Sequence, residues 1–330
     1  MNPRKLRWGI LGVAKINERL LPAFALAAKA ELRAIASRDE GRARQAAAAA
    51  DIPKAYGSYE ALLDDPEIDA VYIPLPNHLH GEWTCKAADH SKHVLCEKPL
   101  APTAAEAQRV VDYCRRKGVH LMDGFMWPHH PRTQRLRQLL DSGEIGEMRL
   151  VNASFTFPLP LDLANIRLQS EMGGGSLLDV GCYPVFGIRW AFGAEPASVL
   201  ATADYQHAVD LSMSGILKLS DGRVGAFDCG FTLPFRGAME IVGTKAIVRI
   251  PQMWLPPRNA TFEIERENRS LETVTVECDS QIAQMLEDFA NAVFEGREPQ
   301  PSPEEAVKTL RVLDALAESA RQGTEAALSK

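Results

Sequence analysis

Apolar residues in the first part of the chain, up to Phe125, occur in short runs that alternate with longer amphipathic stretches. A short apolar run is typical of a strand buried on both faces, and apolar residues at helical spacing are typical of the helices that cover it. This alternation predicts a parallel sheet with covering helices. The predicted strands are Leu6–Val13, Leu32–Ser37, Ala70–Pro74, His93–Cys96 and Val119–Phe125, and the predicted helices are Ile16–Ala28, Glu40–Ala50, Leu79–Ala88 and Thr103–Arg116.

After Trp127 the pattern changes, because most strands there follow one another without a helix between them. Consecutive strands indicate an antiparallel sheet, and Asp221-Gly222 is a hairpin signal between two of them. The second half is therefore predicted to be α+β. Its helices are expected at about Pro131–Leu140 and Leu177–Ala191, with two more at the end of the chain, and its strands at about Arg149–Phe157, Val199–Tyr205, Ser212–Leu219, Val224–Phe231, Ala238–Val242, Ala246–Ile250, Thr261–Glu265 and Glu272–Val276.

Composition narrows the class of protein. A chain of 330 residues is long enough for two packed cores, and its charged content of 24% is that of a globular protein. The net charge of −6, without a cluster of Lys and Arg, argues against a nucleic-acid partner. The six cysteines show no paired spacing, which favours reduced thiols in the cytoplasm. The apolar stretch Trp8–Ala14 is too short to span a membrane, so we expect no membrane partner.

A glycine-containing turn joins the first predicted strand to the first helix. In the segment Trp8–Ile16, Gly12 would let the backbone pass close to a pyrophosphate at the helix N-terminus. The dinucleotide fingerprint is incomplete, since Ala14 replaces its second glycine and Asn17 its third. By itself this motif does not distinguish a dinucleotide site from an ordinary strand–helix turn.

The end of the second strand bears on the choice of cofactor. NAD enzymes usually place an acid there to bind the ribose 2′-hydroxyl, whereas this chain has Ser37-Arg38. A hydroxyl and a guanidinium suit a 2′-phosphate and favour NADP. The alternative is a solvated Arg38 before a helix that Asp39 caps.

Two polar segments follow later strands of the predicted sheet. Pro76-Asn77-His78-Leu79-His80 and Cys96-Glu97-Lys98-Pro99 both lie at carboxyl ends of parallel strands, where such sheets bind ligands. Lys98 could orient a substrate hydroxyl, or it could be a surface residue in a turn set by Pro99. The pairs His78/His80 and His129/His130 lack accompanying acids or thiols, so we expect no metal site. Hydrogen bonding around the cofactor loops is the expected role of these histidines.

A glycine-rich segment, Gly173–Gly175, leads into a helix that carries Asp179 and Tyr183. These two residues are four apart and share one helix face. A Tyr hydroxyl near a Lys ammonium has a lowered pKa and can take the proton of an alcohol as the hydride leaves. The alternative is a glycine-rich turn before a helix with one amphipathic Tyr.

Taken together, these motifs resemble the family of glucose–fructose oxidoreductase, inositol dehydrogenase and the rhizopine-catabolism protein (Gfo/Idh/MocA). The resemblance covers nearly the whole chain, and its most specific part is Glu97-Lys98-Pro99 joined to the later block Gly173–Tyr183. Many members have His where this chain has Tyr183, which resembles the branch of glucose–fructose oxidoreductase, NADP-linked xylose dehydrogenases and dimeric dihydrodiol dehydrogenases. Pro128 stands where many relatives have Arg, which leaves the contacts near the nicotinamide open.

The resemblance implies roles for individual residues. A Lys and a Tyr form the catalytic pair of that branch, which carries over to Lys98 and Tyr183, and Asp179 would fix the geometry. The expected substrate contacts are Trp127, Asn165 and Arg167. The residues expected to bind the cofactor are Gly12, Ala14, Lys15, Ile16, Ser37, Arg38, Leu75, Asn77, His80, Glu97 and Lys98.

The resemblance also implies an architecture. We expect a doubly wound α/β Rossmann domain over residues 1–126 and an α+β domain with a large open antiparallel sheet over residues 127–330. The second domain would bind the substrate and form a homodimer or homotetramer through its sheet. The last helix, about residues 303–322, is a candidate to pack back on the first domain.

These observations predict a cytoplasmic NADP-dependent dehydrogenase that transfers a hydride between the nicotinamide and a CH–OH group of a sugar or related cyclic polyol. NAD is the less favoured cofactor. One alternative is a trans-dihydrodiol or dicarbonyl reductase with the same machinery. Another is a regulator that binds dinucleotide without catalysis, against which the retention of Lys98, Asp179 and Tyr183 argues.

Overall fold

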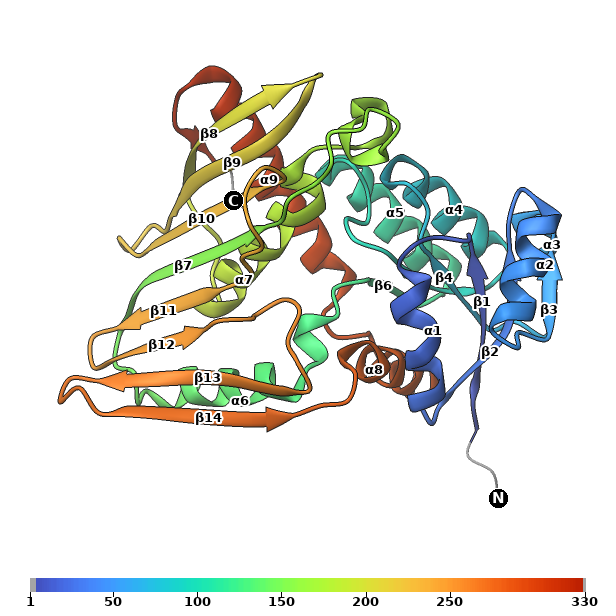
Figure 1. Cartoon of the computed structure of the whole chain (residues 1–330), viewed down its shortest axis with the longest axis horizontal. Helices are drawn as coiled ribbons and strands as arrows, with labels where there is room; N and C mark the ends of the chain where they lie inside the picture. Colours follow the sequence, from blue (N-terminus) through green and yellow to red (C-terminus); the bar gives the residue numbers. More distant parts are fainter. Residues whose placement is uncertain (1–3, 329–330) are drawn as a thin grey trace. The chain divides into compact units, whose positions relative to one another are not determined.

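The computed structural model describes residues 4–328 and divides into two compact units (Figure 1). Of the described residues, the first unit comprises 4–129 and 280–307, and the second comprises 130–279 and 308–328. The chain therefore enters the first unit, builds the second, and returns to the first before it ends in the second.

A six-stranded parallel sheet with the order β3-β2-β1-β4-β5-β6 forms the centre of the first unit. This order, with crossovers on both sides of β1, is that of a doubly wound dinucleotide-binding sheet and confirms the predicted fold class. The strands are β1 (Leu6–Leu11), β2 (Ala30–Ala36), β3 (Lys54–Tyr56), β4 (Ala70–Ile73), β5 (His93–Cys96) and β6 (Leu121–Asp123), and the helices are α1 (Asn17–Leu26), α2 (Glu40–Ala49), α3 (Tyr59–Leu63), α4 (Asn77–Asp89), α5 (Ala104–Lys117), η1 (Trp127–His129) and α8 (Gln281–Glu295).

Local capping fixes where several of these helices begin and end. The Thr103 hydroxyl accepts a hydrogen bond from the backbone N–H of Glu106 at 3.3 Å, and Gly118 ends α5 with a φ of 70°. Asp39 caps α2 in the same way, since its carboxylate accepts from the N–H of Arg42 at 3.0 Å. The cap expected at Asp39 is confirmed. Strand β3 and helix α3 were not predicted, because elements of three and five residues carry too short a pattern.

Helix α8 packs into the first unit although it lies near the end of the chain. Trp8 of β1 is fully buried, and its ring centroid lies 6.0 Å from that of Phe24 in α1 and 5.3 Å from that of Phe289 in α8. The expected second domain, residues 127–330, contained this helix. The structure places it in the first unit because its apolar face completes the core around Trp8.

The last helix, α9 (Pro303–Gln322), was the expected candidate to pack back on the first domain. Its residues up to Val307 belong to the first unit, and the rest belong to the second unit. The helix whose whole length returns to the first unit is therefore α8.

A nine-stranded, mostly antiparallel sheet forms the second unit, with the order β14-β13-β12-β11-β7-β10-β9-β8-β15. Its strands are β7 (Met148–Thr156), β8 (Ser198–Gln206), β9 (Val209–Lys218), β10 (Val224–Gly230), β11 (Met239–Gly243), β12 (Ala246–Ile250), β13 (Asn259–Arg266), β14 (Leu271–Glu277) and β15 (Ala326–Ala327), and its other helices are α6 (Pro131–Ser142), η2 (Ile166–Leu168), η3 (Ser170–Met172), the π-helix η4 (Leu177–Gly181) and α7 (Cys182–Phe192).

One pairing in this sheet departs from the antiparallel expectation. Strand β7 pairs with β10 in parallel, with Leu150 opposite Val224. Helix α7 returns the chain from β7 to the start of β8, and the antiparallel pairs β8–β9 and β9–β10 then bring β10 beside β7 in the same direction. The predicted hairpin between β9 and β10 is confirmed, with Gly222 at a φ of 88°.

The two faces of the sheet differ in how they are covered. Helix α7 packs on one face, where a Cβ added to Gly225 of β10 would lie 2.3 Å from Ile188 (Figure 1). On the other face, Ser154, Ser214 and Ile216 are among the residues that line a groove of about 1170 Å³. The second unit therefore has an open sheet face, as the family resemblance implied.

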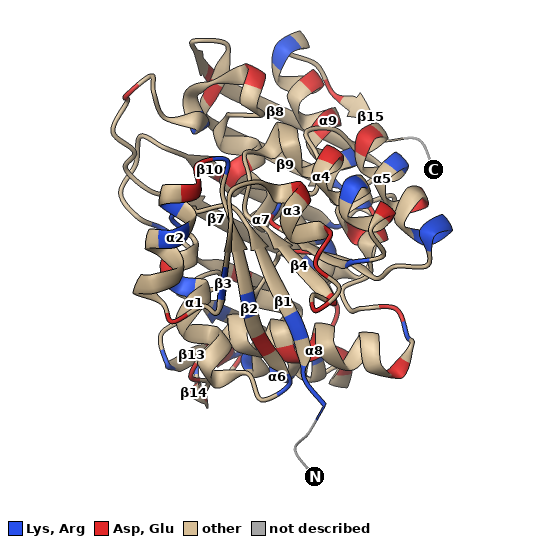
Figure 2. Ribbon diagram, turned by 90° about the vertical axis from the view of Figure 1, so that its right-hand side faces the viewer, with Lys and Arg blue, Asp and Glu red and all other residues tan. Residues whose placement is uncertain are grey.

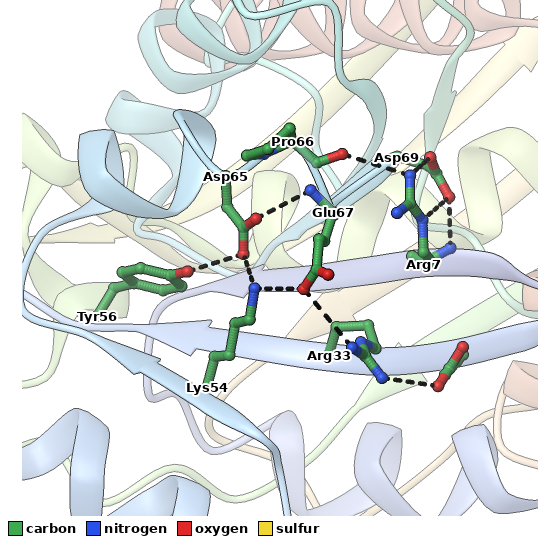
Figure 3. Close-up of polar contacts among 9 residues, drawn as sticks. Arg7, Arg33, Lys54, Tyr56, Asp65, Pro66, Glu67 and Asp69 are labelled. Carbon is green, nitrogen blue, oxygen red and sulfur yellow. Dashed lines mark hydrogen bonds and ion pairs between the residues drawn. The ribbon is translucent and has the colours of Figure 1, made fainter.

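A polar network ties together the amino-terminal edge of the parallel sheet (Figure 3). The carboxylate of Asp65, with 6% of its side chain exposed, accepts from Lys54 Nζ at 2.8 Å and from the Tyr56 hydroxyl at 2.7 Å. Arg7 donates to both carboxylate oxygens of Asp69, at 2.6 and 2.9 Å. These contacts lie at the edge opposite the ends of the strands where the ligand was expected.

Charged residues of both signs are interspersed along the ribbon (Figure 2). Within residues 4–328, no helix is both long and apolar enough to cross a bilayer. Across the same part of the chain, no group of three or more His, Cys, Asp and Glu side chains is arranged to hold a metal ion.

Candidate active site

The predicted glycine turn lies at the carboxyl end of β1. Gly12 has a φ of 136°, which L side chains rarely adopt, and a Cβ there would lie 3.2 Å from the side chain of Leu75. The amide of Asn17 donates to the carbonyl of Gly12 at 2.9 Å. Asn17 therefore pins the turn from the position where the fingerprint has its third glycine. Ala14, Lys15 and Ile16 form the first turn that leads into α1, with carbonyls that accept from the next backbone N–H groups.

Two guanidiniums lie near the end of β2. Ser37 is buried and its hydroxyl accepts from the N–H of Asp39 at 3.2 Å, while Arg38 is exposed. Burial raises the pKa of Tyr59, and the nearby charges of Arg38 and Arg42 oppose that rise. Arg42 was not predicted as a site residue. It lies one helical turn after Arg38, so this spacing was the signal that could have found it.

His80 joins the loops that follow β4 and β5. It is fully buried, its Nδ1 lies 2.7 Å from the carbonyl oxygen of Pro99, and its Nε2 lies 2.7 Å from that of Leu75. His80 thus lies between the carbonyls of two loops, and because burial lowers its pKa to about 4, its neutral ring donates its single N–H to one of them. Its predicted contact with the cofactor stays a prediction. Asn77 begins α4 beside it and is half-buried.

Lys98 is half-buried and lies beside two buried carboxyl groups. Burial raises the pKa of Glu97, against the Lys98 charge and a hydrogen bond from the Tyr72 hydroxyl. Burial and the neighbouring Glu97 raise the pKa of Asp123 to about 8, which the Lys98 charge opposes. At neutral pH this acid pair therefore retains a proton. A fully solvated Lys98, the alternative reading of the sequence, does not describe this environment.

Asp123 was not predicted as part of the site. It ends β6, in register with Cys96 of β5, and the N–H of Gly124 donates both to the Asp123 carboxylate at 3.1 Å and to the carbonyl of Cys96 at 2.7 Å. Only the pairing of β5 with β6 brings it near Glu97. The sequence carries no local signal for that proximity.

The other predicted catalytic residues lie in the second unit. Asp179 is in the π-helix η4, and its carboxylate accepts from Nε of Arg167 at 2.6 Å. Tyr183 lies on the first turn of α7 with 4% exposure, and its ring centroid is 5.0 Å from Phe155 and 5.9 Å from Trp254. The structure thus brings Asp179 together with Arg167, which had been predicted separately as a substrate contact.

The remaining predicted substrate residues, Asn165 and Trp127, make contacts within the protein. The side-chain oxygen of Asn165 accepts from the N–H of Arg167 at 3.1 Å and so caps η2. Trp127 is fully buried in η1. Their contact with a substrate stays a prediction.

The parallel-sheet edge fits a dinucleotide with a 2′-phosphate. Gly12, Ser37, Leu75 and Lys98 all follow carboxyl ends of adjacent strands. Several buried side-chain polar atoms of the described residues have no hydrogen-bond partner, and two of them lie at this edge, Oδ1 of Asn17 and Nδ1 of His78. Both belong to residues at the first turn of a helix that starts from this edge. Such atoms are suited to a polar ligand that would pair with them.

Family models and known proteins match both halves of the chain. The family model described as "Oxidoreductase family, NAD-binding Rossmann fold" (GFO_IDH_MocA) matches residues 6–125, and the model of the GFO/IDH/MocA C-terminal domain matches residues 133–249. The chain is also 39% identical to D-xylose 1-dehydrogenase (NADP(+)) 2 of Haloferax volcanii, over 96% of this chain and 98% of that protein. The chain belongs to the Gfo/Idh/MocA oxidoreductase family.

Other members of the Gfo/Idh/MocA family are similar over most of the chain. KijD10, a 3-ketoreductase from Actinomadura kijaniata solved with NADP and TDP-benzene, superposes with a TM-score of 0.89 at 32% identity, over 96% of this chain and 98% of that one. Trans-1,2-dihydrobenzene-1,2-diol dehydrogenase of Xenopus tropicalis is 36% identical, over 76% of this chain and 77% of that protein. These relatives confirm the predicted family and agree with the expected enzyme class and with NADP.

Proposed function

We propose that this oxidoreductase uses NADP to oxidise or reduce a CH–OH group of a sugar or related cyclic polyol. The observation that carries the proposal is the sheet edge of the first unit, where Lys98 lies along the same edge as the Gly12 turn and the Ser37-Arg38 pair. A dinucleotide and a proton-directing cation would share that edge. The NADP-linked xylose dehydrogenase and the ketoreductase support this assignment.

The cofactor would be held by groups of matched charge. Backbone of the Gly12 turn would approach the pyrophosphate at the start of α1. The Ser37 hydroxyl and the guanidiniums of Arg38 and Arg42 would bind the 2′-phosphate. NADP, when bound, supplies the acceptor or donor of the hydride.

Acid–base chemistry would rest on Tyr183. In the oxidation direction its phenolate oxygen takes the hydroxyl proton of the substrate while the carbon loses a hydride, which leaves a carbonyl. Lys98 would stabilise the phenolate with its positive charge and donate a hydrogen bond to the reacting oxygen. Asp179, paired with Arg167, would hold the turn from which Tyr183 projects.

The charges of one segment support an uncharged substrate. Between residues 150 and 236 every Lys and Arg already has an acidic partner: Arg167 with Asp179, Arg189 with Glu195, Lys218 with Glu325, Arg223 with Asp221 and Arg236 with Asp228. This segment therefore offers no spare cation for a diphosphate. An uncharged sugar is favoured over the nucleotide-linked sugars named for several relatives.

Two alternatives remain from the sequence. A trans-dihydrodiol or dicarbonyl reductase would use the same residues, and the Xenopus relative favours including diols in any test. A regulator that binds dinucleotide without catalysis would need neither the buried acid pair beside Lys98 nor the Arg167–Asp179 pair.

A substrate screen separates these possibilities. Purified protein with NADP is supplied with aldoses, cyclic polyols, trans-dihydrodiols and a dTDP-sugar, and the absorbance of reduced nicotinamide is followed. The proposal expects turnover with an aldose or polyol and faster reduction of NADP than of NAD. Turnover confined to the dTDP-sugar or the diols would replace the substrate class. NADP binding without turnover of any of them would favour the regulator.

A further inference from the structure

A buried carboxylate on β9 holds the turn that presents the predicted catalytic residues of the second unit. Asp210 is 8% exposed, and its Oδ2 accepts from the hydroxyl of Ser176 at 2.6 Å and from the backbone N–H of Leu177 at 2.7 Å. Ser176 itself makes no side-chain cap to the π-helix that begins at Leu177. The cap comes instead from a residue on a distant strand.

The second oxygen of this carboxylate explains the glycine before the helix. A Cβ added to Gly175 would lie 2.3 Å from Oδ1 of Asp210, and the φ of Gly175 is 108°. The backbone can therefore close onto the carboxylate only where no side chain intervenes. Asp210 and Gly175 act as one fitted contact.

The same turn is tied on its other side to the segment that carries Arg167. The N–H of Gly175 donates to the carbonyl of Arg167 at 2.9 Å, and the N–H of Gly174 donates to that of Gln169 at 3.0 Å. The N–H of Asp179 then donates to the carbonyl of Gly175 at 3.1 Å. The turn is thus clamped between Asp210 and the Arg167 segment, and it fixes the start of the helix that bears Asp179 and Tyr183.

Charge also favours this arrangement. A negative group at the N-terminus of a helix is stabilised by the backbone N–H groups there and by the helix dipole. The η4 and α7 segments continue without a break from Leu177 to Phe192, so Asp210 lies at the start of one helical stretch. Burial raises the pKa of Asp210, while the hydrogen bonds from Ser176 and Leu177 oppose that rise.

We propose that Asp210 is a positioning residue of this active site, which sets the orientation of Asp179 and Tyr183 through the Gly175–Leu177 turn. The inference rests on the proposed function of Tyr183. Its geometry, however, can be tested without any turnover. Nothing in the local sequence marks Asp210, because the contact joins residues 33 and 34 positions apart in the chain.

The test uses Asp210→Asn in the full-length protein, with Asp221→Asn as the matched control. Asp221 is exposed at the tip of the β9–β10 hairpin, where its carboxylate forms an ion pair with Arg223. In Asp210→Asn the negative charge is lost, so the one oxygen that accepts from both Ser176 and Leu177 becomes the weaker acceptor of an amide. We expect kcat with the best sugar to fall about 10- to 100-fold, as for a displaced catalytic group, with the KM for NADP within about twofold.

Two further readouts separate positioning from general destabilisation. Amide hydrogen exchange over residues 173–183 should become faster in Asp210→Asn and stay unchanged in Asp221→Asn. The pH midpoint of alcohol oxidation should move in Asp210→Asn, because the hydroxyl of Tyr183 then lies at a different position relative to the neighbouring charges. Wild-type turnover, or a lower kcat with an unmoved pH profile, would overturn the proposal.

Further variants keep the proposal testable if Asp210→Asn folds poorly. Ser176→Ala removes one bond to the carboxylate and should act in the same direction by a smaller factor. Gly175→Ala should also impair turnover, and combining it with Asp210→Ala should cost less than the product of the single losses. Additive losses would contradict the fitted contact. If the wild-type protein turns over no sugar, the proposed function fails, while the exchange measurement still decides whether Asp210 holds the turn.

Discussion

At the scale of single residues, the candidate site is held by partners that lie far apart in the chain, such as Asp210 with Ser176 and Asp179 with Arg167. Gly12 and Lys98 follow the ends of strands, and Asp179 follows the glycine-rich turn, as the sequence predicted. The sequence did not predict a role for Asp123 or Asp210, because each contacts its partners only through strand pairing or packing between distant segments. Arg167 was predicted as a substrate contact, yet the structure uses its Nε to hold Asp179. Local motifs identify which residues can do chemistry, and tertiary contacts decide how they are held.

Cofactor choice is tested at this scale by Arg38→Ala. Losing a charge-assisted hydrogen bond to the 2′-phosphate should weaken NADP binding about ten- to a hundredfold, while NAD binding should hardly change. Arg42→Ala should act in the same direction, because both guanidiniums lie near Tyr59. Fluorescence titration with both cofactors measures this.

The control is Arg44→Ala on the same helix, where Arg44 pairs with the exposed Glu40. It should leave both affinities unchanged. Equal losses for NADP and NAD in Arg38→Ala would mean that the 2′-phosphate is not bound there.

At the scale of elements, long periodic segments were predicted well. Very short elements were missed, and one helix that packs against a distant part of the chain was assigned to the wrong domain. Strand β5 and the Asp39 cap of α2 match the prediction, whereas β3 is three residues long and was missed. Helix α8 was predicted as a helix but assigned to the other domain. Periodicity shows that a helix has an apolar face, and it does not show that this face is completed by Trp8 near the opposite end of the chain.

The network at the amino-terminal edge of the parallel sheet predicts how acid affects this element (Figure 3). Burial raises the pKa of Asp65, but hydrogen bonds from Lys54, the Glu67 backbone and Tyr56 outweigh it and lower the pKa to about 2. An unfolded Asp has a pKa of about 3.9. As the pH falls from about 4 to about 2, the unfolded chain therefore binds a proton that the folded one does not, and stability is lost.

Lys54→Met should lower stability at neutral pH and reduce its loss between about pH 4 and pH 2, because the pKa of Asp65 then rises toward its ordinary value. Urea unfolding across that range measures both effects. Arg44→Met, which breaks an exposed pair, should leave the profile as it is. If the free energy of unfolding of Lys54→Met fell as steeply as that of the wild type between about pH 4 and pH 2, this network would not be the cause of the acid dependence.

At the scale of the whole molecule, the open sheet face of the second unit bears on assembly. Leu200 and Ile216 are among the residues that line its groove, and Leu200 is 37% exposed. Apolar side chains exposed together on an open sheet face favour association, so we expect two or more copies to pair through this face. Light scattering should give at least twice the chain mass of 36.3 kDa. Ile216→Asp should shift the mass toward that of one chain, and a wild-type protein that stays at 36.3 kDa at micromolar concentration would contradict the expectation.

The central claim is that this chain is an NADP-linked dehydrogenase in which Tyr183 carries the proton. The most direct test is the turnover of Tyr183→Phe with NADP and the best substrate of the screen. The substitution keeps a ring that packs against Phe155 and Trp254 and removes only the hydroxyl. We expect kcat to fall about 10²- to 10⁴-fold with little change in NADP affinity. Turnover at the wild-type rate would contradict the account and move the proton to another group.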